Sequence, residues 1–405
     1  MKNVFSAARI LGVVCIFCMT FVVKAWAEGA GPGINFRQLT LQQALEVAKT
    51  EKKPVYVHGY TDWCHFCMYM KDSVYPDKEV GDFFNANFIS IKVNMEKEGK
   101  KLNDSLKIHT YPAMLFYDSN GELMHRAAGR RYKQPFLELG RESLDPRRQL
   151  RTFKNKYDSG TATPYEVQFY FRMQEIAGMD AQPMLNEYLM KQPVDSFTAQ
   201  NNWRIMYDII KDPYLPVVQK FIENKKQLEK IYTVDSVNNK LITLYNSRLM
   251  QYVQQLDTNG YDKLIKSIKA NEKLDIREKI CAWADLNRAK MKSDWETYKK
   301  LSQPFVEKYA MDDFRRLNDI SDIYYQRYNS DKELLAKASS WAKRSVEIAD
   351  LYKGNHILAS ITYIQGNKEE AKKIAEHAIE VGKRDKNDVR QTEQLIKVID
   401  QGLAK

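Results

Sequence analysis

Apolar and polar residues recur with two different periods in the first third of the chain. Residues 39–53 have apolar side chains three and four positions apart, the spacing of one helix face. That face consists of Leu41, Ala44, Leu45 and Ala48, and Thr40 is the predicted N-cap. Residues 54–60 are a short β-branched and aromatic run, which predicts a buried strand. In residues 88–95 every second residue is apolar, which predicts a strand with one buried and one polar face.

Further elements extend this alternation of helix and strand. Short helices are predicted from residue 68 up to Pro76 and over residues 78–88. Residues 112–118 and 122–129 have the composition of two strands, joined by a Ser-Asn-Gly turn. The predicted order is α, β, α, α, β, α, β, β, so the N-terminal part of the chain belongs to the α/β class.

The strand pattern ends at about residue 145, and helical spacing continues from there. Breaks at Gly, Pro, Asn and Asp predict an all-α array of short antiparallel helices over residues 143–405. Residues 356–382 resemble a tetratricopeptide repeat, and the similar region extends over about residues 320–385. The matching positions are Ala359, Tyr363, Gly366, Ala371 and Ala378. Such a helical solenoid either binds a protein partner on its concave face or caps the chain without one.

The first 27 residues have the features of an export signal. Lys2 and Arg9 give a positive start, and residues 10–23 form an apolar run that is short for a membrane span. Small residues suited to a cleavage site follow this run. We therefore expect a signal peptide at residues 1–27, a linker at 28–36 and an exported, periplasmic protein. The alternative is an uncleaved segment that anchors the chain to a membrane.

Composition and charge narrow the function classes. The chain has 405 residues, with 63 Lys and Arg against 52 Asp and Glu, and a net charge of +11. A mean hydropathy of −0.55 excludes a membrane protein with many spans. No nucleic-acid recognition motif accompanies this mild charge, so we expect no nucleic-acid partner. Residues 126–156 contain ten basic and three acidic side chains, which either attract an acidic partner or form a solvated surface.

Two of the five cysteines, Cys64 and Cys67, lie three positions apart at a predicted strand-to-helix junction. Such a pair binds a metal, closes a small disulfide ring, or does neither. Structural zinc needs four ligands, and no second pair remains once the export segment with Cys15 and Cys18 is removed. We therefore expect no metal and no cofactor. Cys281 lies on an apolar helical stripe, which favours a small buried hydrophobic residue over a third redox thiol.

The residues around the pair resemble a known fold. Trp63 precedes the pair, and Pro112 begins a predicted strand 45 residues after Cys67. With a strand before the pair and a hairpin after Pro112, residues 37–142 resemble the thioredoxin fold. They are most similar to exported thiol:disulfide interchange proteins with an Asp-Trp-Cys-x-x-Cys motif.

The chain departs from the thioredoxin pattern at three positions. Phe66 stands where thioredoxins carry Pro, Met68 where Lys is common, and His58 where they carry a buried acid. Because residues between the cysteines tune the redox potential, these departures leave reduction, oxidation and isomerisation open as the direction of the reaction.

The position of the pair and the resemblance together suggest roles for the catalytic residues. Cys64, at a helix start, is the expected nucleophile, because a helix N-terminus stabilises a thiolate. Cys67 is expected to be more buried and to resolve the mixed disulfide, which closes the Cys64–Cys67 disulfide. His58 is a candidate acceptor of the Cys67 proton; the alternative is a packed histidine bonded to the backbone.

The resemblance also implies a substrate-binding edge. In the family the proline equivalent to Pro112 is cis, and the residue before it, here Tyr111, pairs with substrate backbone like an added strand. The alternative is an ordinary trans proline at the start of a strand. Trp63, His65 and Phe66 are the other expected substrate-binding residues.

These expectations favour an exported thiol–disulfide oxidoreductase that exchanges disulfides with protein substrates and with a redox partner protein. The alternative is a chaperone-like adaptor, in which the helical region binds a protein partner and the cysteine pair is redox-quiet.

Overall fold

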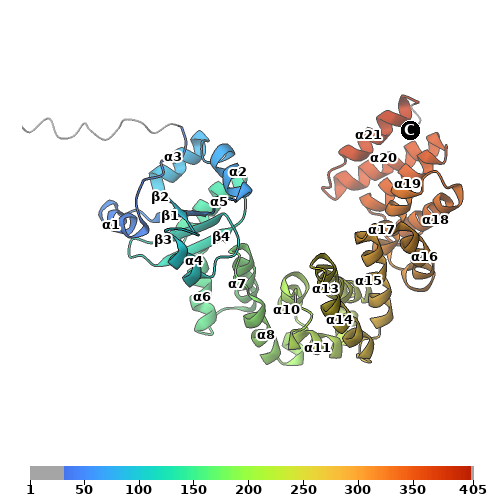
Figure 1. The fold of residues 1–405 in the computed structure, drawn as a ribbon, viewed down its shortest axis with the longest axis horizontal. Helices are drawn as coiled ribbons and strands as arrows, with labels where there is room; N and C mark the ends of the chain where they lie inside the picture. The colour runs from blue at the N-terminus through green and yellow to red at the C-terminus, as the bar shows by residue number, and fades with distance from the viewer. Residues whose placement is uncertain (1–31, 403–405) are drawn as a thin grey trace, which may run out of the picture. The chain divides into compact units, whose positions relative to one another are not determined.

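The computed structural model describes residues 32–402 (Figure 1). The chain divides into two compact units, Met1–Ile210 and Lys211–Lys405, each of which we describe by itself. The expected signal peptide lies outside the described residues, as do residues 28–31 of the expected linker. Within residues 32–402, no helix combines the length and the apolar character that crossing a membrane requires.

A four-stranded mixed sheet forms the centre of the N-terminal unit. Its strands are β1 (Val55–Tyr60), β2 (Ile89–Asn94), β3 (Ala113–Tyr117) and β4 (Leu123–Ala128), in the order β2-β1-β3-β4. β1 pairs in parallel with β2 and antiparallel with β3, and β3 pairs antiparallel with β4. A parallel pair needs a crossover connection, which α2 (His65–Ser73) and α3 (Lys78–Asn87) provide.

Helices cover both faces of the sheet, and each face has its own hydrophobic core. On one face α2, α3 and α5 (Lys133–Leu144) pack over aromatic side chains, with the rings of Phe84 and Phe136 stacked at 4.4 Å between centroids. On the other face α1 (Leu41–Glu51) and α4 (Lys100–Leu106) pack over an aliphatic core. The predicted α/β thioredoxin fold is confirmed.

The local predictions hold in most places and fail in one strand. Thr40 caps α1 in a capping box with Gln43, as the sequence pattern indicates. In β2, however, Ser90 and Asn94 are buried, although alternation predicts that they face solvent. Phe36 forms a bridge to Ser90, and Asn94 donates to a carboxylate oxygen of Asp62 at 2.9 Å, so other segments cover this strand.

The helices that follow the sheet lie against its edge strand. α6 (Leu150–Asp158) and α7 (Pro164–Ile176) contact β4, and the Leu150 amide donates to Nδ1 of His125 at 3.1 Å. These contacts join α6 and α7 to the edge strand of the sheet.

A buried cation strengthens this attachment. Arg126 on β4 donates through Nε to the carbonyl of Ala177 at 2.9 Å and through Nη1 to the carbonyl of Leu106 at 2.7 Å. These carbonyls belong to the ends of α7 and α4, where helix dipoles place partial negative charge. Gly178 follows with φ +67°, and a Cβ built there would lie 2.9 Å from Cβ of Ala128 and 3.2 Å from Cβ of Thr110.

Every element between residues 146 and 402 is helical, as predicted. The N-terminal unit ends with α8 (Gln182–Lys191), α9 (Val194–Phe197), α10 (Gln200–Arg204) and the π-helix η1 (Ile205–Ile209). The C-terminal unit contains α11 (Pro216–Glu223), α12 (Lys225–Tyr232), α13 (Val234–Gln254), α14 (Thr258–Ala270), α15 (Arg277–Met291), α16 (Trp295–Phe305), η2 (Val306–Ala310), α17 (Phe314–Arg327), α18 (Lys332–Ile348), α19 (Tyr352–Ile364), α20 (Lys368–Arg384) and α21 (Arg390–Asp400).

α19 and α20 form a helical hairpin at the place where the sequence resembles a tetratricopeptide repeat. Ala359, Ala371 and Ala378 are fully buried, and Gly366 has φ +90° between the two helices. Small residues at these positions allow the two helices to approach closely. Assignment to that repeat family stays a prediction. Cys281 is buried in α15 and has no disulfide partner among residues 32–402, and burial raises the pKa of its thiol.

Candidate active site

The cysteine pair lies where β1 leads into α2. Cys64 is the N-cap of α2, and its Sγ accepts a hydrogen bond from the Cys67 amide at 3.1 Å. The two residues form a disulfide, with their Cα atoms 5.2 Å apart. Their exposed fractions are 4% and 5%, so the expectation that Cys67 is the more buried residue is wrong for the disulfide form.

The peptide between Tyr111 and Pro112 is cis and lies just before β3. The Gly129 amide donates to the Pro112 carbonyl at 2.8 Å, which joins this peptide to the end of β4. The Tyr111 ring packs edge-on against the Trp63 ring, with 5.8 Å between their centroids. The residue before the cysteine pair therefore contacts the residue before the cis proline. Trp63 also donates from its indole nitrogen to Glu96 at 2.9 Å.

The expected substrate-binding side chains are accessible. Trp63 is 62% and Phe66 53% exposed, His65 is exposed, and Tyr111 is half-buried. Tyr111 donates from its hydroxyl to Asn103 at 2.6 Å. These residues therefore surround the disulfide with an open aromatic surface.

His58 is buried in β1, with 3% of its surface exposed. Its Nδ1 lies 2.7 Å from the hydroxyl of Tyr75, which in turn lies 3.1 Å from the hydroxyl of Tyr56. Burial, and secondarily the positive charge of Lys92, lowers the pKa of His58 to about 3. The imidazole is therefore neutral at ordinary pH, and burial raises the pKa of Tyr75 so that its hydroxyl keeps its proton.

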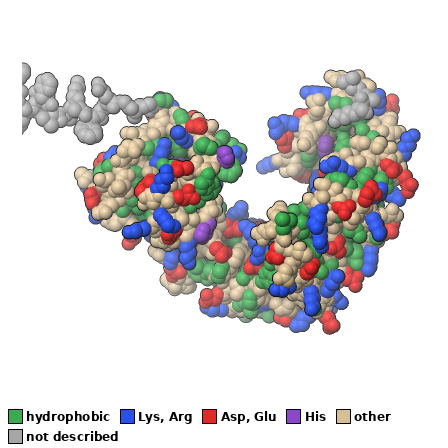
Figure 2. Space-filling model, viewed as in Figure 1, with side chains coloured by type: hydrophobic (Ala, Val, Ile, Leu, Met, Phe, Trp, Pro, Cys, Tyr) green, Lys and Arg blue, Asp and Glu red, His purple; other side chains and the backbone are tan. Residues whose placement is uncertain are grey.

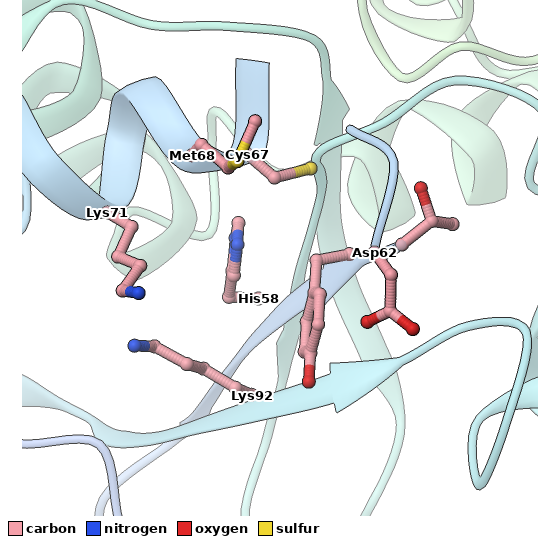
Figure 3. A pocket seen from close by; sticks show the side chains of 8 residues that line it. His58, Asp62, Cys67, Met68, Lys71 and Lys92 are labelled. Atoms are coloured by element: carbon pink, nitrogen blue, oxygen red, sulfur yellow. The ribbon is translucent and has the colours of Figure 1, made fainter. Parts of the chain in front are cut away.

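His58 and Cys67 line the same pocket, of about 300 Å³ (Figure 3). The other lining residues are Tyr60, Thr61, Asp62, Met68, Lys71 and Lys92. Figure 3 shows the imidazole of His58 below Cys67, with the ammonium groups of the two lysines beside it. Burial, followed by repulsion from Lys71, lowers the pKa of Lys92. Neither lysine has a carboxylate partner among residues 32–402.

Sequence reasoning missed Tyr75 and Lys92 as neighbours of His58. The sequence does contain a pattern from which Lys92 could be predicted as a neighbour of His58. Lys92 lies on the polar side of β2 and pairs in register with His58 on β1. No such pattern indicates Tyr75, since it lies 17 residues away and reaches His58 only through packing on the sheet. In the described part of the chain, no group of three or more Asp, Glu, Cys or His side chains has the arrangement of a metal site.

Comparison with known proteins points in the same direction. Residues 33–109 match the family described as "Thioredox_DsbH: Protein of unknown function, DUF255". The chain is 32% identical over 97 residues to the thiol:disulfide interchange protein DsbD of Photorhabdus laumondii, covering 22% of this chain and 16% of that protein. It is 34% identical over 56 residues to spermatogenesis-associated protein 20 of Rattus norvegicus, covering 14% of this chain and 7% of the relative.

A solved structure is also similar. It is the solution structure of a disulphide-isomerase candidate from Bacteroides thetaiotaomicron, 34% identical, with 29% of this chain and 98% of the other covered and a TM-score of 0.27. The chain spans between 7% and 40% of the length of the curated relatives that it matches. The family match and the sheet order agree on one assignment: the N-terminal region of this chain is a thioredoxin-like domain, and a helical region follows it.

Proposed function

We propose that the protein is an exported thiol–disulfide oxidoreductase that exchanges disulfides with protein substrates through Cys64 and Cys67. The observation that carries this proposal is the position of Cys64 as N-cap of α2, where its Sγ accepts the Cys67 amide. After reduction, the same amide and the helix dipole would stabilise a thiolate on Cys64. Export rests on the sequence of residues 1–27, with periplasmic release as the proposal and membrane anchoring as its alternative.

The exchange proceeds in two substitutions at sulfur. The Cys64 thiolate attacks one sulfur of a substrate disulfide, so that the substrate S–S bond breaks, one substrate thiolate leaves and a mixed disulfide forms. Cys67 then loses its proton and attacks Sγ of Cys64. The second substrate thiolate leaves, the substrate has gained two electrons, and the pair is oxidised. The reverse sequence oxidises a substrate dithiol.

His58 is the proposed acceptor of the Cys67 proton. It is neutral at ordinary pH because burial lowers its pKa to about 3, and it lines the pocket below Cys67. The tautomer that accepts at Nε2 donates from Nδ1 to the Tyr75 hydroxyl, which lies at 2.7 Å. Tyr75 is therefore a positioning residue, and Tyr75→Phe should slow resolution of the mixed disulfide while leaving attack by Cys64 unchanged.

Substrate trapping tests the proposal. Cys67→Ser, with Cys64 reduced, should accumulate mixed disulfides with insulin-type substrates that still carry their disulfides, because the resolving thiol is absent, whereas Cys64→Ser should accumulate none. Cys281→Ser is the matched control, since that thiol is buried in the other unit, and it should behave as the unmodified chain. Titration of the pair in glutathione buffers then gives the direction of the reaction. Equal trapping by both variants would contradict the proposal.

A second candidate is the adaptor function, which a groove in the C-terminal unit favours. A cavity of about 1040 Å³ lies between α17, α19 and α21, with Tyr352, His356 and Leu395 among its lining residues. A peptide segment fits such a space. If the pair neither reduces insulin nor exchanges with glutathione, the adaptor is the better description.

A further inference from the structure

Three aromatic rings gather around one guanidinium group beside the disulfide. Arg130 lies over the rings of Phe66, Tyr69 and Tyr132, with 5.4, 5.1 and 4.8 Å between its Cζ and the ring centroids. It also donates from Nη2 to the Tyr132 hydroxyl at 2.8 Å. We call these four residues the Arg130 cluster. Phe66 and Tyr132 are 53% and 54% exposed, which is unusual for large apolar rings and typical of binding surfaces.

The Arg130 cluster lies against both halves of the active site. Phe66 and Tyr69 belong to α2, the helix that begins at the cysteine pair. Arg130 directly follows Gly129, whose amide bonds the Pro112 carbonyl. Figure 2 shows hydrophobic side chains gathered on the N-terminal unit over the side where α2 lies. A chain segment bound at the disulfide would therefore extend over this cluster.

Arg130 differs from most of the other basic residues of segment 126–156 in having no ion pair within residues 32–402. Seven of them pair with carboxylates: Lys133, Arg141, Arg147, Arg148, Arg151, Lys154 and Lys156. Arg126 is buried against carbonyl groups instead, and Arg131 donates from Nη1 to the Arg130 carbonyl at 3.3 Å. Among the residues that the structure describes, Arg130 has no carboxylate partner. The positive charge beside the disulfide is thus uncompensated.

We propose that the Arg130 cluster recognises substrate segments that carry a carboxylate side chain next to the reactive cysteine. The inference rests on the proposed oxidoreductase function and names its substrate class. The rings hold the guanidinium plane in place by cation–π contact. A plane fixed in this way keeps N–H groups on its outer edge, which match the two oxygens of a carboxylate. The exposed rings of Phe66 and Tyr132 then contact apolar neighbours of that carboxylate.

The test uses two peptides of identical sequence except for Glu or Gln before their single cysteine. Each peptide is joined by a disulfide to thionitrobenzoate. The reduced full-length protein supplies two electrons, and the products are the oxidised pair, the peptide thiol and the coloured thionitrobenzoate anion. The second-order rate of colour release is measured for each peptide. We expect the Glu peptide to react about 3- to 10-fold faster at low salt, with a smaller ratio at high salt.

Two variants identify the residue responsible for the preference. Arg130→Gln should bring the Glu-to-Gln rate ratio close to 1, and Arg130→Lys should restore part of it. Lys49→Gln is the control, because it removes one exposed charge from α1 on the opposite face of the sheet, and it should leave the ratio unchanged.

The outcomes separate this inference from the function on which it rests. Equal rates for the two peptides, or a preference that survives in Arg130→Gln, would overturn the assignment of Arg130 while leaving the oxidoreductase function intact. Loss of the preference in Lys49→Gln would mean that net charge, rather than the Arg130 cluster, selects the peptide, and would also overturn it. If neither peptide reacts with the unmodified protein, the proposed function fails and the inference with it.

Discussion

Two glycines at helix ends form a matched pair for testing how the helical region is attached to the sheet. Gly178 and Gly160 have nearly the same φ, +67° and +69°. A Cβ on Gly160 would meet no atom within 4 Å. A Cβ on Gly178 would lie 2.9 Å from the Cβ of Ala128, which no rotamer change can move. The two alanine variants therefore share the strain of a positive φ, but only in Gly178→Ala does the added Cβ overlap a neighbouring atom.

The expected costs follow from these contacts. Placing alanine in the left-handed region costs roughly 1–2 kcal/mol, and this is the whole effect expected of Gly160→Ala. Overpacking against a fixed neighbour adds about 1–3 kcal/mol. Gly178→Ala should therefore lower the stability of the segment around β4 by about 2–5 kcal/mol.

Hydrogen exchange locates the effect as well as measuring it. Amides of β4 (Leu123–Ala128) should exchange roughly 5- to 140-fold faster in Gly178→Ala than in Gly160→Ala, because the variants differ by about 1–3 kcal/mol and 1.4 kcal/mol corresponds to a factor of ten. Peptides from the C-terminal unit serve as the internal control. Equal exchange of β4 in the two variants would refute the idea that the turn after α7 holds this strand.

Three further predictions concern the same unit. Burial lowers the pKa of His58 to about 3, so between about pH 3 and 6.5 the unfolded chain binds a proton that the folded chain does not. The free energy of unfolding should therefore fall as the pH drops through this window, by up to about 1.4 kcal/mol per pH unit. In a series of denaturation curves at different pH, His58→Phe should show a weaker dependence of that free energy on pH. Arg126→Met leaves one buried and one partly buried carbonyl without this donor and should cost about 2–4 kcal/mol in denaturant unfolding, whereas Arg172→Met on the exposed side of α7 should cost almost nothing. A fragment of residues 32–145 should unfold at a lower denaturant concentration than residues 32–210, because it lacks the helices against β4; equal midpoints would contradict this.

The sequence predicts what depends on local pattern. Strands β1, β3 and β4 follow from short apolar runs and a turn, and the place of Cys64 at a helix start follows from the junction of two patterns. The polar positions of β2 were misjudged because their burial depends on Phe36, which is distant in sequence from Ser90.

The environments of Arg126 and Arg130 could not be predicted, because they depend on contacts between residues that are distant in the sequence. Arg126 bonds a carbonyl 51 residues away, and its charge alone suggested a solvated surface. Likewise, some carboxylates that pair with the basic neighbours of Arg130 lie on other elements, such as Asp77 and Glu79 for Lys133, so the sequence does not show which basic residue is left without one. Neither the carbonyl contacts of Arg126 nor the lack of a carboxylate beside Arg130 leaves a periodic pattern in the sequence from which it could be predicted.

Each outer strand of the sheet has a neighbour along part of its length. Phe36 borders β2 through its bridge to Ser90, and α6 and α7 lie against β4. An unoccupied edge strand offers a row of free amide and carbonyl groups to any extended chain, and aggregation begins at such edges. A protein that handles unfolded substrates meets extended chains constantly, so an open edge would hold them unproductively, away from the disulfide. Under the proposed function, the helices against β4 would keep extended substrates from that edge, and an incoming chain would find its backbone partner at Tyr111 instead.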